Sequence, residues 1–325
     1  MPNQGFQTQI YDQPVIGFAG DRASNNQYAS YDAGPFGLVS GASGATVGRF
    51  AWAVPPLDTN GAPTIVNSFG QGNVAGLVPR FMQGSNATYL SNAGMTVLPG
   101  YQIILITGGD FLALNEGTTQ AQRGMKAYAD VQTGKVSFAA AGSPATGASA
   151  TASSIAASTA SVTGSITGNL LNVTAVGAGV LYPGATISGT LVATGTRIIG
   201  QLTGAAGGIG TYTVSIPEQT VASTAISATY GTFTVGTLVG ATLFAVNNAL
   251  AATGSVVAGT TLTALISGTG GTASTFAVTN NTVVASQTIS AITSVETPFF
   301  ALNSGLPGEI VKISAPVAGF GTQLS

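Results

Sequence analysis

A long stretch in the middle of the sequence carries almost no charge, and this feature most limits how the chain can fold. Between Val136 and Val295 only Arg197 and Glu218 are charged, and all other charged residues lie before or after this stretch. The two ends of the chain therefore resemble each other more than either resembles the middle. We expect the middle to be an insertion in one outer domain, which residues 1–140 and 294–325 form together.

The uncharged stretch begins with a segment of small residues. Residues 139–164 are nearly all Ala, Ser, Thr and Gly, with one Pro. Such small side chains bury little apolar surface, so their burial does not offset the entropy lost when the backbone is ordered. We therefore predict a flexible linker over residues 141–164. The alternative is an extended arm that becomes ordered against a partner.

Beyond this segment, apolar and polar residues alternate. Leu171 and Val173 alternate with Asn172 and Thr174, and residues 211–216 follow the same pattern. A period of two is typical of half-buried strands. Frequent glycines mark turns, and abundant Thr and Val favour sheet over helix. Helix signals are weak throughout, so we predict an all-β fold.

The insertion also repeats itself. The sequence that starts at Thr196 aligns with the sequence that starts at Thr260. Self-similarity of this kind indicates repeated structural units. The repeat predicts either two tandem β modules, residues 165–230 and 231–293, or one sandwich built from two related halves.

Few side chains are available for chemistry. The 325 residues include no His, no Cys, 8 basic and 10 acidic residues. Acid–base catalysis and activation of nucleophiles depend mainly on titratable groups, and His and Cys are the usual zinc ligands. Asp110 with Glu116, or Asp12 with Asp21, could form an acid–base pair, but the sequences GGDF and NEGT favour turns in which such side chains bond their own backbone. We predict no catalytic residue, no metal site and no cofactor.

The charge balance and the distribution of apolar residues also limit the partners. The net charge is −2 and no basic cluster is present, whereas nucleic-acid binding requires grouped Lys or Arg. No apolar run approaches the roughly 18 residues of a membrane-spanning helix. The first residues lack the basic and apolar regions of a secretory signal. We expect neither a nucleic-acid partner nor a membrane partner, and no standard export.

Four segments near the two ends form a recognisable set. They begin with GDRASNN at Gly20, AGPFGLV at Ala33, TYLSNAG at Thr88 and ETPFFAL at Glu296. Together they resemble the structural cement proteins, or capsid decoration proteins, of tailed bacteriophages. The middle is similar to Gly/Thr-rich β modules found as insertions in phage virion proteins. The resemblance implies a β-barrel or jelly-roll-like outer domain built from both chain ends, with an inserted pair of β-sandwich-like modules.

The resemblance also implies a function. It points to a non-enzymatic virion protein, made in the host cytoplasm, that lies on the outer surface of the capsid as a dimer or trimer. There it would bridge major capsid subunits and project its inserted modules outward. The N-terminal arm, residues 1–20, could add a strand to a neighbour.

Aromatic, apolar and basic residues of the outer domain are the candidates for contact with the capsid or with another subunit. For the aromatic residues a place in the core is the default expectation, because burying a large ring stabilises the fold. The candidates are Phe6, Ile10, Tyr11, Arg22, Phe50, Trp52, Arg80 and Phe81.

Two other functions remain open. Tandem Thr/Gly-rich β modules also suit a phage fibre or adhesin that binds a host-surface glycan or receptor. A glycan hydrolase with two carboxylates is a more distant alternative. The position of the protein on the particle separates the first two, because a decoration protein covers the head lattice and an adhesin lies at the tail tip or along a filament.

Overall fold

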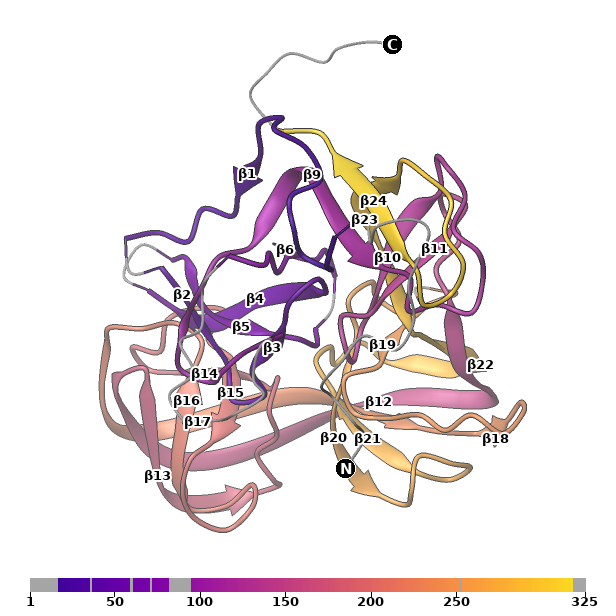
Figure 1. Cartoon of the computed structure of the whole chain (residues 1–325). Coiled ribbons are helices and arrows are strands. Elements are labelled where there is room, and N and C mark those ends of the chain that lie inside the picture. The colour runs from indigo at the N-terminus through magenta and orange to yellow at the C-terminus, as the bar shows by residue number, and fades with distance from the viewer. Residues whose placement is uncertain are drawn as a thin grey trace, which may run out of the picture.

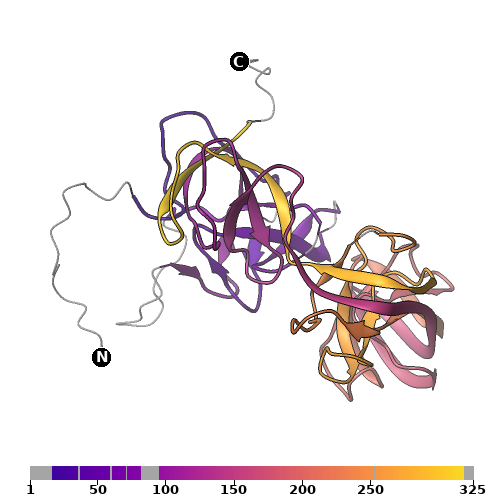
Figure 2. The same ribbon diagram turned by 90° about the vertical axis from the view of Figure 1, so that its right-hand side faces the viewer.

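The computed structural model describes residues 17–35, 37–58, 61–70, 72–81, 95–251 and 253–317. Within these residues every helix-or-strand element is a β-strand, so the predicted all-β class is confirmed. The strands form two eleven-stranded sheets and a two-stranded sheet of β3 (Ala45–Thr46) and β7 (Thr96–Val97). Figure 2 shows two bodies, one mostly purple and yellow and the other mostly pink and orange.

The first large sheet contains strands from both ends of the chain. Its hydrogen-bonded order is β11-β10-β23-β24-β9-β6-β4-β5-β2-β8, and β1 pairs with β9. The C-terminal strands β23 and β24 therefore lie between β10 and β9, as the yellow and magenta ribbons show (Figure 1). We call the body built on this sheet the outer domain. Its strands are β1 (Ala29–Ser30), β2 (Leu38–Ser40), β4 (Phe50–Leu57), β5 (Pro63–Asn67), β6 (Gly76–Leu77), β8 (Gln102–Ile103), β9 (Ile106–Leu114), β10 (Lys126–Asp130), β11 (Val136–Ala139), β23 (Ser294–Ala301) and β24 (Ile310–Ala315).

The two ends of the chain also share one core. Along β24, Val311, Ile313 and Ala315 are buried and alternate with partly exposed residues. The rings of Phe50 and Phe299, from opposite ends of the sequence, are fully buried with centroids 5.6 Å apart. Burying a side chain of this size contributes about 1.5–3 kcal/mol. Much of the outer-domain core therefore depends on residues that the insertion separates in sequence.

The second large sheet contains only strands of the insertion, and we call its body the inserted domain. Its main order is β15-β16-β13-β12-β17-β21-β20; β14 pairs with β17, β18 with β12, and β22 with both β12 and β19. The strands are β12 (Thr146–Gly168), β13 (Leu170–Ala178), β14 (Thr186–Gly189), β15 (Ile198–Gln201), β16 (Gly210–Val214), β17 (Gln219–Thr234), β18 (Thr237–Leu238), β19 (Ala249–Leu250), β20 (Leu262–Ser267), β21 (Thr275–Val278) and β22 (Val284–Ile292).

The prediction of a flexible linker over residues 141–164 is wrong. Most of this segment lies in β12, which pairs with β22 and β18 near its start and with β13 and β17 near its end. Backbone hydrogen bonds on both sides order the strand even though its own side chains are small. Its buried alanines, such as Ala148, Ala150 and Ala160, pack against larger residues that neighbouring strands supply.

The internal repeat corresponds to two equivalent sets of strands. The hairpin β15–β16 is matched by the hairpin β20–β21. The threonines that start the two repeats also make the same contact. Thr196 Oγ1 donates to the Ala193 carbonyl at 2.6 Å, and Thr260 Oγ1 donates to the Val257 carbonyl at 2.7 Å. The sequence repeat is therefore also a repeat of local structure.

The two halves of the inserted domain have separate cores but shared strands. In β12, Ile155 packs in one core and Val162 in the other, and β17 is divided in the same way between Phe233 and Ile226. This arrangement agrees with the second alternative, one body made of two related halves. The domain limits 165–230 and 231–293 stay a prediction.

The two crossings between the outer and inserted domains run side by side. Thr146 of β12 is the antiparallel partner of Ile292 of β22, and Figure 2 shows both ribbons passing between the bodies. Next to them, the Gly142 amide donates to the Glu296 carboxylate at 2.7 Å, and the Tyr128 hydroxyl lies 3.0 Å from the same Oε2. These two hydrogen bonds lower the pKa of Glu296, the Gly142 bond contributing most. The Glu296 carboxylate, bonded by the Tyr128 hydroxyl and the Gly142 amide, therefore stabilises the outer domain next to the crossing.

Asp110 of β9 contacts residues from both ends of the chain. Asp110 Oδ2 accepts from Ser24 Oγ at 2.7 Å and Asn26 Nδ2 at 2.9 Å, and lies 3.6 Å from Lys312 Nζ of β24. Burial alone raises the pKa of Asp110, but hydrogen bonds from Ser24, Ser314 and Asn26 and the charge of Lys312 outweigh burial, so the pKa lies below its usual value. The ionised carboxylate is therefore the form that the fold stabilises.

A proline in β12 tests whether this strand supports both halves of the inserted domain. Val162 is paired with Val176 of β13 and Ile226 of β17, so Val162→Pro removes a ladder hydrogen bond whichever side its N–H faces. We expect cooperative unfolding of both halves at a lower temperature, measured by calorimetry. Val162→Ala is the control, and it removes only side-chain packing, with a cost of about 1–3 kcal/mol. A proline variant as stable as the alanine variant would contradict this account.

Substitution of Asp110 should give a pH-dependent loss of stability. A depressed folded-state pKa stabilises the fold above the unfolded-state pKa of about 3.9, and this contribution is lost as pH falls through the folded-state value. Asp110→Asn should therefore lower the thermal midpoint at neutral pH, and the difference from the wild type should shrink below about pH 4. Asp32→Asn, at an exposed position, is the control. A difference that does not change with pH would argue against the assigned role.

Candidate functional site

Aromatic and arginine side chains lie on the surface of the outer domain where its N-terminal segment runs antiparallel along β9. They form two contact groups, Phe18 with Arg80 and Tyr28 with Arg22 and Phe81, which are linked because Arg80 and Phe81 are consecutive residues. We call these five residues the aromatic–arginine patch. Phe18 is 58% exposed and Tyr28 is 43% exposed. Aromatic residues and Arg are enriched in protein interfaces, so the patch has the composition of a contact surface.

Backbone pairing places this segment. The amide of Gly20 donates to the Leu112 carbonyl at 2.7 Å, and the amide of Leu112 donates to the Asp21 carbonyl at 2.9 Å. Gly20 also accepts from the Arg80 amide at 2.8 Å and has a φ of +89°. A Cβ at Gly20 would lie 2.9 Å from the Arg80 nitrogen, so only glycine allows this close approach. The segment therefore brings Arg80 next to β9.

Tyr28 packs on one side against two aromatic rings and the backbone of a glycine. Its ring lies 5.9 Å from that of Phe81 and meets the buried ring of Phe111 edge to face at 6.2 Å. Gly109, with a φ of +107°, lies under Tyr28, where an added Cβ would come within 2.7 Å of the tyrosine Cβ. The tyrosine is therefore packed in one place while a large part of it faces solvent.

Both arginines of the patch lie over rings. The Arg22 guanidinium is 4.8 Å from the Tyr28 ring centre, and the Arg80 guanidinium is 4.5 Å from that of Phe18. Arg80 Nη1 also lies 3.3 Å from Asp21 Oδ1. Such cation–π pairs contribute about 0.5–1 kcal/mol at exposed sites. They also fix the arginine planes before any partner arrives, which lowers the entropy cost of binding.

Three of the predicted interface residues lie in this patch. They are Arg22 and the adjacent residues Arg80 and Phe81; Tyr28 contacts both Arg22 and Phe81, although Arg22 and Phe81 are far apart in sequence. Three others, Phe6, Ile10 and Tyr11, lie outside the described residues.

The remaining two predicted interface residues lie in the core. Phe50 is 0% exposed and Trp52 is 2% exposed. Phe50 packs on Phe299, and the Trp52 indole N–H reaches the Gly72 carbonyl at 3.3 Å. The interface prediction is wrong for both, because β4 is an inner strand whose alternate side chains fill the core.

The sequence interpretation missed Phe18 and Tyr28, and it named Asp21 only as an acid–base partner of Asp12, which lies outside the described residues. A signal was present for the two rings, because both occur in Gly-, Asn- and Ser-rich sequence without the alternation that would bury them. An aromatic residue in such surroundings has no strand face to occupy and is left on the surface. The pairing of Asp21 with Arg80 carried no sequence signal, because the two residues are brought together only by the fold.

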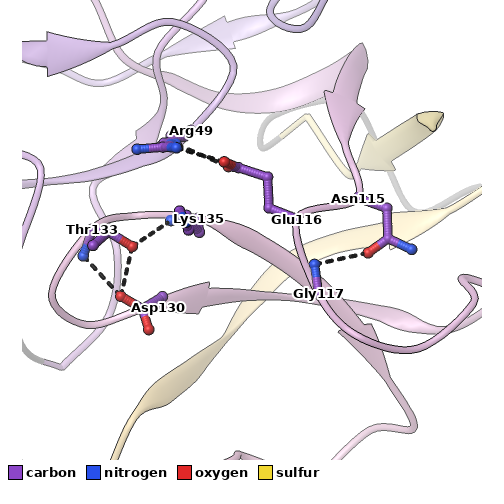
Figure 3. A network of polar contacts seen from close by, with 7 residues as sticks. All are labelled: Arg49, Asn115, Glu116, Gly117, Asp130, Thr133 and Lys135. Carbon is purple, nitrogen blue, oxygen red and sulfur yellow. Dashed lines mark hydrogen bonds and ion pairs between the residues drawn. The ribbon is translucent and has the colours of Figure 1, made fainter. Parts of the chain in front are cut away.

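A second polar cluster lies at the end of β9 (Figure 3). Arg49 Nε donates to Glu116 Oε2 at 2.8 Å, and its Nη2 donates to Oε1. Asp130 Oδ1 accepts from the amide and hydroxyl of Thr133. A cavity of about 350 Å³ lies beside Glu116 and Asp130. The Glu116 carboxylate thus joins the end of β9 to the start of β4, and the Asp130 carboxylate is engaged within the β10–β11 turn.

The acidic pair Asp110 and Glu116 does not meet at one site. Asp110 faces the N-terminal segment and Glu116 faces Arg49. The predicted turn bonding holds for NEGT, where Asn115 Oδ1 accepts from the Gly117 amide at 3.1 Å. It is wrong for GGDF, because Asp110 lies within β9 and bonds Ser24 and Asn26 instead.

Among the described residues, no group of three or more acidic side chains is placed to hold a metal ion. The same residues include no helix that is long and apolar enough to cross a membrane.

Comparison with known proteins identifies the family. The model of one family, the XM1 gp53 minor capsid protein, matches residues 6–175, more than half of the chain. The matched range includes the whole aromatic–arginine patch and β12. No curated protein and no solved structure matches the sequence. The family match confirms the predicted association with a phage capsid. The chain belongs to the XM1 gp53 minor capsid protein family.

Proposed function

We propose that this minor capsid protein binds the outside of the phage head through the outer domain and bridges neighbouring major capsid subunits. The inserted domain then projects away from the shell. Membership of a minor capsid protein family supports a structural role in the virion. The aromatic–arginine patch is the observation that carries the proposal, because it is a pre-arranged, partly exposed group of the residue types that dominate binding energy at interfaces.

Bridging is supported by the physics of repeated attachment. A single patch offers only a few anchor side chains, which suits a modest affinity. A homo-oligomer that touches several capsid subunits gains from effective concentration, and its avidity exceeds the single-site affinity by about 10² or more. A dimer and a trimer both satisfy this requirement.

Cryo-electron microscopy of intact particles tests the proposal directly. Density for the outer domain should lie over the junctions of the head lattice, with the inserted domain further from the shell. Density at the tail tip or along a filament would instead support an adhesin. Density inside the shell would contradict placement on the outer surface.

Removing exposed rings should weaken attachment to heads. Phe18→Ala and Tyr28→Ala each delete an exposed ring of the patch, and the double variant should lower the amount bound to heads that lack this protein by about tenfold or more. Leu191→Ala, at a 78% exposed apolar residue of the inserted domain, is the matched control and should bind normally. Equal binding by the double variant would remove the patch from the interface.

Attachment should depend weakly on salt. The patch arginines already have internal partners, namely Asp21 for Arg80 and the Asn26 carbonyl for Arg22. Binding that depends on apolar burial is little affected when screening shortens the reach of charges. Heads washed with about 0.1 M and about 1 M NaCl should retain similar amounts of the protein, as measured by gel densitometry. Release in moderate salt would show that charge attraction dominates.

A further inference from the structure

A groove lies between the outer domain and the inserted domain. Its volume is about 810 Å³. The outer domain contributes Val54, Pro55, Pro56 and Ile65, and the inserted domain contributes β15 with residues next to it. Apolar walls of this kind favour a partner with aliphatic side chains.

Arg197 supplies a positive charge to this groove. It is one of two charged residues between Val136 and Val295, and the groove lining includes no Asp or Glu. Within the described part of the chain, the Arg197 side chain makes no ion pair or hydrogen bond. A guanidinium beside apolar walls is best satisfied by a carboxylate, which it binds through paired N–H groups.

Gly200 lines the groove and leaves open space beside its backbone. A Cβ added there would meet no atom within 4 Å, and the backbone of Gly200 does not require glycine. Amide side chains of Asn67, Asn169 and Asn247 line the surrounding walls. Such amides can donate to and accept from an extended peptide backbone. The groove therefore suits an extended peptide that carries one acidic residue among apolar ones.

The N-terminal segment of the chain has this chemistry. In residues 1–16 the only charged side chain is Asp12. The apolar or aromatic residues Ile10, Tyr11, Val15 and Ile16 flank it in the sequence. The described chain begins on the side of the outer domain that faces away from the inserted domain, as the indigo start of the ribbon shows (Figure 2). The segment therefore starts away from the groove of its own chain and can lead toward another molecule.

We propose that residues 1–16 of a second copy of this chain bind in the groove, with Asp12 paired to Arg197. The contact joins an arm of one molecule to both domains of the next. It can close by reciprocal exchange in a dimer or head to tail in a ring. The proposal goes beyond capsid binding and does not depend on it, because it concerns contact between copies in solution.

Sedimentation velocity of the purified full-length chain without capsids tests this inference. The wild type should form a closed oligomer over a micromolar concentration range. Arg197→Glu and Asp12→Lys should each weaken association by about tenfold or more, because each places like charges together. The double variant with both substitutions should recover association, since it restores an opposite pair.

Two further variants separate blocking of the groove from damage to the fold. Gly200→Leu fills open space and should abolish association with an unchanged thermal midpoint. Gly271→Leu, where an added Cβ makes only ordinary contacts at 3.6 Å or more, should associate as the wild type does. A monomeric wild type, a Gly200→Leu variant that still associates, or a charge-swapped double variant that stays dissociated would each overturn the proposal. None of these results bears on whether the protein binds heads.

Discussion

Backbone pairing along β12 is the constraint on which the inserted domain depends. The strand pairs with four others and contributes residues to both cores of the inserted domain. Its side chains are too small to hold it by burial alone, so its order comes from hydrogen bonds on both sides and from the larger residues of its neighbours. The two related halves are consequently parts of one sheet.

Sequence patterns predicted the class of fold better than its connections. Alternation around Leu171 and Tyr212 correctly indicated strands with one buried face. The Ala/Ser/Thr run before Gly164 was misread, because composition reports what a segment can bury by itself and not what its neighbours provide. The same limit applies to the site. Arg22, Arg80 and Phe81 were named one by one, but the contact of Phe81 with Tyr28, which lies beside Arg22, depends on non-local pairing with β9 that no local pattern encodes.

The few charged residues of the outer domain are mostly engaged with one another, as in the pairs Arg49–Glu116, Arg80–Asp21 and Lys312–Asp110. Arg197 lies in the part of the chain with the fewest charges and has no ion-pair partner in the described structure. A protein whose surface is polar but hardly ionic relies on shape, rings and backbone contacts for recognition.

The crossing beside Glu296 has a consequence for how such a protein can change. Thr146 and Ile292 are cross-strand partners, so the inserted domain leaves and rejoins the outer domain at points only about 5 Å apart. A short turn could close that gap, and an unrelated domain with adjacent termini could occupy the same place. The inserted domain can therefore be replaced by another domain, over evolution or by design, while the sheet of the outer domain keeps its strand order.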